Sequence, residues 1–212
     1  MAGRDPECVF CAIVAGELEA VLVHYSTDFI FDGAADQPYT ETSAPRPQSV
    51  YAASKLLGEW FAQEAPAHYV LRVESLFGGL TRLKSSLDTI IARLATGVPV
   101  RVFTDRVVSP SYVWDVAEAT ASLLRLRPPF GIYHCVNSGH ATWHDVAVAA
   151  ARQLGTPALV EPITLAEVHL RASRPRYCAL SNDKLRAAGI PMPTWQDALA
   201  REVARHSPPA SH

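Results

Sequence analysis

The chain has 212 residues, of which 49% are apolar and 19% are charged, a balance typical of a globular protein and not of a disordered one. One domain is the default expectation at this length. The formal net charge of −2 disfavours a general nucleic-acid or anionic-membrane binder, because such proteins usually carry a basic excess.

The first predicted strand covers residues 20–25, a short apolar run that ends in the polar residues 26–28. Residues 33–49 are rich in proline and predict a loop. A three-to-four spacing of Tyr51, Lys55, Leu56 and Glu59 predicts a helix over 49–64, which Pro66 stops. Another apolar run predicts a strand over 68–73.

In the middle of the chain, residues 83–96 predict a helix that Gly97 closes. The next predicted elements are a strand over 100–103, an amphipathic helix over 112–126 and a strand over 131–136.

In the last third, a T-x-x-D capping sequence at Thr142 opens a helix that ends before Gly155. Smaller helices are predicted over 181–188 and 195–205, and the tail 207–212 is expected to be loose. Strands that alternate with helices predict an α/β fold with a parallel sheet, here a thin one of four strands. The helix-rich final third predicts a smaller lobe packed on that sheet.

The pair Tyr51-x-x-x-Lys55 carries the sharpest chemical signal. Residues four apart lie on one face of a helix, and an ammonium beside a tyrosine favours the phenolate, so the tyrosine can act as an acid near neutral pH. Thr27 adds a hydroxyl at the carboxyl end of a predicted strand, where open α/β sheets bind ligands. The alternatives are a solvated Tyr/Lys pair and a hydroxyl that only bonds the backbone.

Residues 25–33 read YSTDFIFDG and resemble the STDYVFDG signature of the dTDP-4-dehydrorhamnose reductase family, a group of extended short-chain dehydrogenases/reductases. Further pieces follow in family order: PYTE at 38–41, YAASKLLGE at 51–59, LRVESLFG at 71–78, GIYH at 131–134, TWHD at 142–145 and ASRP at 172–175. The resemblance covers residues 20–205 and implies a Rossmann-like parallel sheet with a small C-terminal substrate-binding lobe.

The resemblance implies reduction, by NADPH or NADH, of the C4 keto group of a dTDP-linked 4-keto-6-deoxy sugar in dTDP-rhamnose biosynthesis. It implies that Tyr51 is the general acid, that Lys55 holds the nicotinamide ribose, and that Thr27 hydrogen-bonds the substrate carbonyl or Tyr51. Arg72 and Ser75 belong to the strand and turn that would flank the nicotinamide.

For the sugar substrate, the resemblance implies contacts from Asp28, Phe29 and Arg174. Phe29 stands where the family usually has a tyrosine, which removes one hydroxyl contact. Arg174 is interpreted as a partner of the diphosphate, with a surface arginine as the alternative. Trp143 packs in the core or lies near the nucleotide, and the core is favoured.

The sequence contains no G-x-G-x-x-G or G-x-x-G-x-x-G turn for a pyrophosphate. It resembles the rear two-thirds of such a reductase, and residues 7–17 instead resemble the N-terminus of histidine-triad hydrolases. The predicted divisions are a fragment over 1–19, the reductase-like domain over 20–206 and the tail. A gene fusion, a rearrangement or a misassembled reading frame would each explain the join.

The four cysteines do not form a disulfide framework, and we expect a cytoplasmic protein. Cys8 and Cys11 could hold zinc with histidines, but no H-x-H-x-H run is present, so we expect free thiols and no metal. The N-terminus carries no targeting signal, and no apolar run is long enough for a membrane span.

An open sheet edge and an apolar face are expected where the family's first three strands would pair, which predicts association with another chain, either a homodimer through that edge or a binding partner. The expected partner is a dTDP-sugar, without nucleic acid or membrane. The alternative to an enzyme is a non-catalytic nucleotide-sugar-binding or regulatory module.

Overall fold

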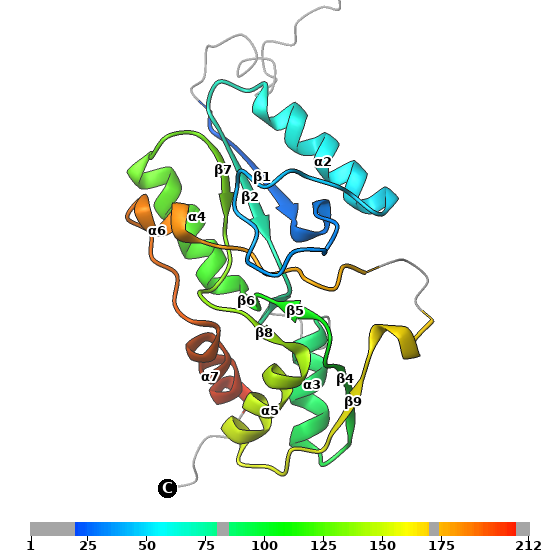
Figure 1. Cartoon of the computed structure of the whole chain (residues 1–212). Helices are drawn as coiled ribbons and strands as arrows, with labels where there is room; N and C mark the ends of the chain where they lie inside the picture. The colour runs from blue at the N-terminus through cyan, green and yellow to red at the C-terminus, as the bar shows by residue number, and fades with distance from the viewer. Residues whose placement is uncertain (1–19, 80–84, 170–173, 207–212) are drawn as a thin grey trace, which may run out of the picture.

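The computed structural model describes residues 20–79, 85–169 and 174–206. These residues form two lobes, one above the other in Figure 1. The upper lobe contains a parallel sheet of three strands in the order β1 (Leu22–Thr27), β2 (His68–Val73) and β7 (Gly131–His134). Leu22 pairs with His68 and Tyr69 with Gly131, so all three strands end on the side that faces the lower lobe.

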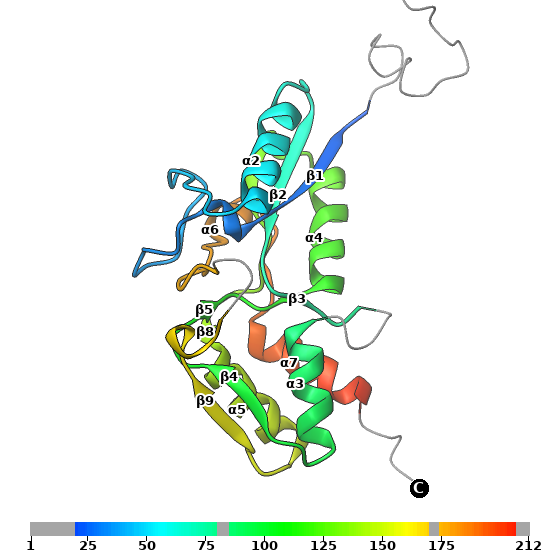
Figure 2. The same ribbon diagram turned by 90° about the vertical axis from the view of Figure 1, so that its right-hand side faces the viewer.

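Two long helices cover opposite faces of this sheet, as Figure 2 shows. One is α2 (Val50–Gln63), and the other is α4 (Val113–Leu126). The hydroxyl of Ser49 accepts from the Ala52 N–H and caps α2. The buried face of α2 presents Ala52, Leu56, Glu59 and Ala62 at the predicted three-to-four spacing.

The lower lobe is built from segments that are far apart in the sequence. Its helices are α3 (Ser86–Ala95), α5 (Trp143–Leu154) and α7 (Trp195–His206), and its parallel strands are β4 (Val100–Phe103) and β9 (Val160–Ile163). One apolar cluster joins these helices to β4. The prediction that this lobe would come from the final third was too narrow, because α3 and β4 also contribute to it.

The predicted four-stranded sheet is corrected by this arrangement. The strand over 100–103 forms as expected, but it pairs with β9 in a separate sheet, so the main sheet has three strands among the described residues. The apolar pattern predicts no strand at β9 (Val160–Ile163), because Glu161 and Pro162 interrupt it.

Capping boxes start two helices of the lower lobe. Ser85 and Asp88 exchange side-chain to backbone hydrogen bonds at α3, and Thr142 and Asp145 do so at α5, as its T-x-x-D sequence predicts. Gly155 closes α5 in the left-handed conformation.

The two lobes meet at short strand pairs. β3 (Leu76–Phe77) runs parallel to β6 (Ser111–Tyr112), and β5 (Val107–Val108) runs antiparallel to β8 (Ala141–Thr142). The remaining short elements are the 3-10 helices η1 (Asp28–Ile30) and η2 (Leu165–Glu167) and the helix α6 (Asp183–Ala187). A strap over residues 174–180 crosses the junction: the Cys178 N–H donates to Val107 O, and the Tyr177 N–H donates to Gly33 O.

Within the described part of the chain, β1 pairs only with β2, so its other edge carries no strand. The outer face of α2 also exposes large apolar side chains, with Val50 88%, Trp60 58% and Phe61 70% exposed. Both features agree with the open edge that the sequence predicts. Residues 1–19 and 207–212, with Cys8 and Cys11, lie outside the described residues, so the predicted end fragments stay predictions.

Candidate functional site

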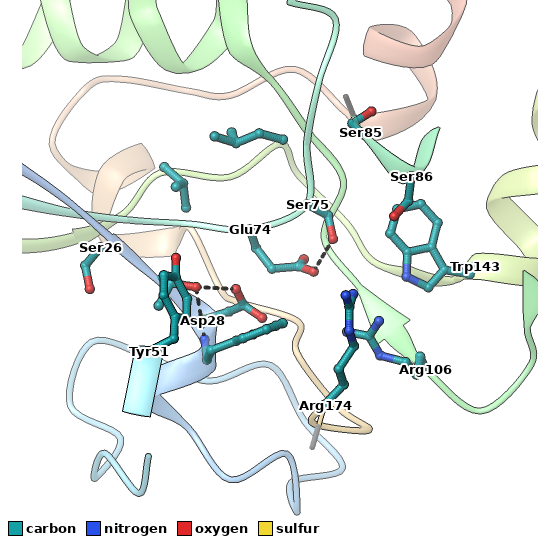
Figure 3. A pocket seen from close by; sticks show the side chains of 14 residues that line it. Ser26, Asp28, Tyr51, Glu74, Ser75, Ser85, Ser86, Arg106, Trp143 and Arg174 are labelled. Carbon is teal, nitrogen blue, oxygen red and sulfur yellow. Dashed lines mark hydrogen bonds between the residues drawn. The ribbon is translucent and has the colours of Figure 1, made fainter. Parts of the chain in front are cut away.

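A cavity of about 530 Å³ lies at the carboxyl ends of β1 and β2, where the lobes meet. This is the place where an open α/β sheet binds its ligand. Figure 3 shows its walls, which are formed by Ser26, Thr27, Asp28, Phe29, Tyr51, Val73, Glu74, Ser75, Leu76, Ser85, Ser86, Arg106, Trp143 and Arg174. Six of the eight residues that the sequence singles out for the site therefore line one cavity.

Thr27 ends β1 and caps η1. Its hydroxyl accepts a hydrogen bond from the Phe29 N–H at 3.3 Å and donates to Asp28 Oδ1 at 2.9 Å. Because backbone and carboxylate both hold this hydroxyl, its position at the cavity wall is fixed before any ligand arrives.

Tyr51 lies in the first turn of α2 and reaches the cavity from the side of the sheet that α2 covers. Its ring meets that of Phe29 edge to face, with 6.2 Å between the centroids. The tyrosine side chain is 53% exposed. It is therefore supported on one side by Phe29 and open to solvent on the other.

Lys55 does not line the cavity. Its Nζ donates to the backbone carbonyl of Tyr25 on β1. The lysine still lies one helical turn from Tyr51, and its charge, together with burial as the larger effect, lowers the pKa of His24.

Arg72 is also outside the cavity, and its contacts are structural. The guanidinium is fully buried and pairs with Glu59 through two hydrogen bonds, from Nε to Oε1 at 3.0 Å and from Nη2 to Oε2 at 2.8 Å. It lies over the ring of Phe31, 5.3 Å from the centroid. These partners leave the guanidinium inside the upper lobe, so we do not keep Arg72 in the site.

The inner wall of the cavity carries a buried acidic cluster. Carboxylate oxygens of Asp28 and Glu74 and the sulfur of Cys178 all lie within 4.8 Å of one another. Burial raises the pKa of Asp28 to about 6, against the opposing effects of Cys178 and Thr27. Burial and the charge of Asp28 raise the pKa of Glu74 well above its ordinary value.

Arginines form the other side of the cavity. Arg106 is 4% exposed and donates from Nε to Pro175 O at 3.2 Å, whereas Arg174 is exposed. Figure 3 shows both guanidiniums reaching into the space opposite Tyr51, with Trp143 beside them. Trp143 is 6% exposed and belongs to the core of the lower lobe, as predicted, while one side of it borders the cavity.

Sequence reasoning missed Glu74 and Arg106. Glu74 lies inside the quoted motif LRVESLFG, directly before Ser75, whose φ of 43° is a strained backbone conformation typical of functional sites. A charged residue at the end of a buried strand was the available signal for Glu74. Arg106 follows β4 in a separate sheet, and no local pattern connects it to the site.

Comparison with known proteins identifies the family. The family model described as RmlD substrate binding domain matches residues 9–207, so the chain belongs to this family. It is 37% identical over 181 residues to a probable dTDP-4,6-dihydroxy-2-methyloxan-3-one 4-ketoreductase of Streptomyces antibioticus, covering 84% of this chain and 61% of that protein. A dTDP-4-dehydrorhamnose reductase of Mycobacterium tuberculosis is 36% identical over 193 residues, covering 87% and 63%.

Solved structures agree with this assignment. The crystal structure of a dTDP-4-dehydrorhamnose reductase from Bacillus anthracis in complex with NADP superposes with a TM-score of 0.82 at 29% identity, covering 92% of this chain and 68% of that one. The predicted α/β fold with Rossmann-like relatives is thereby confirmed. The chain spans less than two thirds of the length of the two curated relatives named above.

Of the residues that the resemblance assigns to a nicotinamide dinucleotide, Tyr51 and Ser75 line the cavity, and Lys55 does not. Tyr51 is half-exposed, Lys55 follows one turn later, and Ser75 lies on the facing turn. The printed sequence has no glycine-rich turn that could bind the pyrophosphate. Among the described residues, no helix has both the length and the apolar character that crossing a membrane requires.

Proposed function

We propose that the chain binds a dTDP-linked 4-keto-6-deoxy sugar in the cavity between the lobes. One observation carries this proposal: Thr27 and Tyr51 line the same cavity as Arg174, and Figure 3 shows the Arg174 guanidinium across the space from Tyr51. A nucleotide sugar has the same polarity, with a neutral carbonyl at one end and a diphosphate further along. Guanidinium groups suit a diphosphate because they donate paired hydrogen bonds.

In this proposal Thr27 and Tyr51 contact the C4 oxygen, and Tyr51 is the group that releases a proton to it. Asp28 and Phe29 border the sugar, and Arg174 pairs with the diphosphate. A bound NADPH or NADH would supply the hydride. Lys55 would hold its ribose and Ser75 would border its nicotinamide ring.

A second candidate is a nucleotide-sugar-binding module without turnover. The position of Lys55 favours it, because its Nζ donates to the backbone carbonyl of Tyr25 and the residue does not line the cavity. The two candidates share the sugar site and differ in dinucleotide binding.

For either candidate function, we propose a cytoplasmic location, in keeping with the buried free thiols of Cys135 and Cys178.

Calorimetric titration with dTDP-L-rhamnose tests the shared part of the proposal. We expect saturable binding that Arg174→Gln weakens about tenfold, the effect of losing one charge-assisted hydrogen bond. Arg176→Gln is the matched control, since this exposed arginine lies two residues away on the same strap and does not line the cavity. Equal binding by both variants, or no binding by the unmodified chain, would contradict the proposed site.

Titration with NADPH then separates the two candidates. Micromolar binding, with ketone reduction that Tyr51→Phe abolishes, would establish the reductase. Sugar binding without NADPH binding at millimolar concentration would establish the module.

A further inference from the structure

Among the described residues, one cation faces the acidic cluster of Asp28, Glu74 and Cys178, which is too little positive charge for both carboxylates to be ionised. Asp28 starts η1, Glu74 lies between β2 and β3, and Cys178 lies on the strap. The cationic group that faces the cluster is the guanidinium of Arg106, whose Nη2 lies 3.7 Å from the Cys178 sulfur. All four side chains are at most 4% exposed.

One buried guanidinium balances one carboxylate, and a second unpaired carboxylate would cost several kcal/mol in such surroundings. Burial also raises the pKa of the Cys178 thiol well above its ordinary value, so the thiol adds no charge. The cluster therefore holds one carboxylate and one carboxylic acid at neutral pH.

The hydrogen bonds indicate which group keeps the proton. Glu74 Oε1 lies 2.6 Å from Ser75 Oγ, a partner that can accept from a carboxylic acid, and its Oε2 accepts from the Ser109 N–H. Asp28 Oδ1 instead accepts from Thr27, and its buried Oδ2 has no hydrogen-bond partner in the described part of the chain. The raised pKa values agree, since that of Glu74 lies well above its ordinary value and that of Asp28 is about 6.

The protonation state of Asp28 decides what the Thr27 hydroxyl offers to the cavity. When Asp28 is ionised, Thr27 donates to it and accepts from the Phe29 N–H, which leaves one lone pair for an incoming donor. When Asp28 takes up a proton from solvent, its O–H donates to Thr27 Oγ1. Both lone pairs of Thr27 are then occupied, and its own O–H turns toward the cavity as a donor.

We propose that Asp28 and Glu74 form a one-proton switch that makes this cavity select between a carbonyl and a hydroxyl ligand at the position facing Thr27. Glu74 is a positioning residue that keeps the acid form, and Asp28 exchanges the proton with solvent. A carbonyl accepts from Thr27 in the doubly protonated state, and an alcohol donates to Thr27 in the singly protonated state. The inference rests on the proposed nucleotide-sugar site.

The first test needs no ligand. Infrared spectra of the free chain at pH 7.5 should contain the C=O band of a buried carboxylic acid. Glu74→Gln should remove that band, whereas the exposed control Glu118→Gln should retain it. Glutamine is isosteric with protonated glutamate, so this variant keeps the hydrogen-bond geometry of Glu74. Absence of the band from the unmodified chain would overturn the proposal.

The second test measures selection directly. Dissociation constants for the ketone dTDP-4-keto-6-deoxyglucose and the alcohol dTDP-L-rhamnose are compared at pH 5 and pH 7.5. The ratio of the two dissociation constants cancels any pH dependence of the contacts to the dTDP group, because both ligands carry that group. We expect the affinity for the ketone relative to the alcohol to rise about tenfold from pH 7.5 to pH 5. At the lower pH the ketone gains one hydrogen bond from Thr27, and the alcohol loses one.

In Asp28→Asn the ratio should differ by less than about twofold between the two pH values, because a side-chain amide does not titrate in this range. Glu74→Gln should keep the pH dependence, since it mimics the acid form. A pH-independent ratio in the unmodified chain, together with normal binding of dTDP-L-rhamnose at pH 7.5, would overturn the switch and leave the proposed function intact. No binding of either nucleotide sugar would overturn both.

Discussion

At the scale of single residues, the site places an ionisable carboxyl group, that of Asp28, in a buried position. Asp28 is 4% exposed, yet it supports Thr27 at the cavity wall and lies beside a second carboxyl group. Its raised pKa means that ionisation costs free energy in the folded chain. The ionised Asp28 carboxylate thus lowers the stability of the folded chain, a trade-off that is common for residues that serve a site.

This cost gives the first prediction, a pH-dependent gain in stability for Asp28→Asn. The pKa of Asp28 is about 6 in the folded chain and about 3.8 as its ordinary value, so between these values the folded state binds more protons than the unfolded state. The free energy of unfolding therefore falls as pH rises through this range. Relative to the unmodified chain, the variant should gain roughly 2 kcal/mol at pH 7.5 compared with pH 4.

Urea unfolding at the two pH values measures this difference. Glu118→Gln, an exposed carboxylate on α4, is the control and should change the free energy of unfolding by less than about 0.5 kcal/mol at either pH. An equal effect of Asp28→Asn at both pH values would show that its carboxyl group titrates normally in the folded chain.

At the scale of elements, the sequence predicted what local periodicity controls. The helices α2, α4, α5 and α7 and the strands β2 and β4 lie within two residues of the predicted bounds. The pairing of β4 with β9 was not predictable, because it joins residues about 60 positions apart and leaves no local pattern. The same reason hid Arg106 and the contact of Glu74 with Asp28, which only the meeting of the lobes creates.

The strap over residues 174–180 is held to the upper lobe by a close backbone approach at Gly33. This glycine has a φ of +75°, and a Cβ there would lie 2.5 Å from Pro175 Cβ. Gly97 has a similar φ of +69° but open space around it. Both positions therefore require a left-handed backbone, but only Gly33 is also closely packed.

This contrast gives the second prediction. Gly97→Ala should cost about 1 kcal/mol of stability, the cost of a left-handed backbone alone. Gly33→Ala should cost a further 1–3 kcal/mol or so from overpacking, and should weaken dTDP-L-rhamnose binding because the strap carries Arg174. Thermal unfolding and calorimetry of both variants provide the comparison. Equal losses would mean that the strap moves away freely.

At the scale of the whole molecule, the upper lobe is covered incompletely. The outer edge of β1 has no strand beside it among the described residues, and α2 exposes Trp60 and Phe61. Unpaired edges and apolar patches favour association with another chain. We therefore keep the sequence-based proposal that the chain forms a homodimer through this side.

The third prediction concerns this association. Sedimentation should show a concentration-dependent dimer that Leu22→Lys, at the start of β1, and Phe61→Lys, on α2, each weaken. Leu126→Lys is the control, because this leucine is also exposed, at 55%, but lies at the end of α4 on the other face of the sheet. A monomer at all concentrations, or an equal effect of the control, would contradict the proposed interface.

The two buried thiols near the junction of the lobes can report on how fast different parts of the molecule open. Cys178 is 1% exposed on the strap, and Cys135 is fully buried in the upper-lobe core. A thiol reagent reaches Cys178 only when the strap lifts, and Cys135 only when the upper lobe opens, so site-resolved labelling rates separate local opening from global unfolding. A ligand that spans the cavity should slow the first rate more than the second, which turns occupancy of the site into a kinetic signal that needs no turnover.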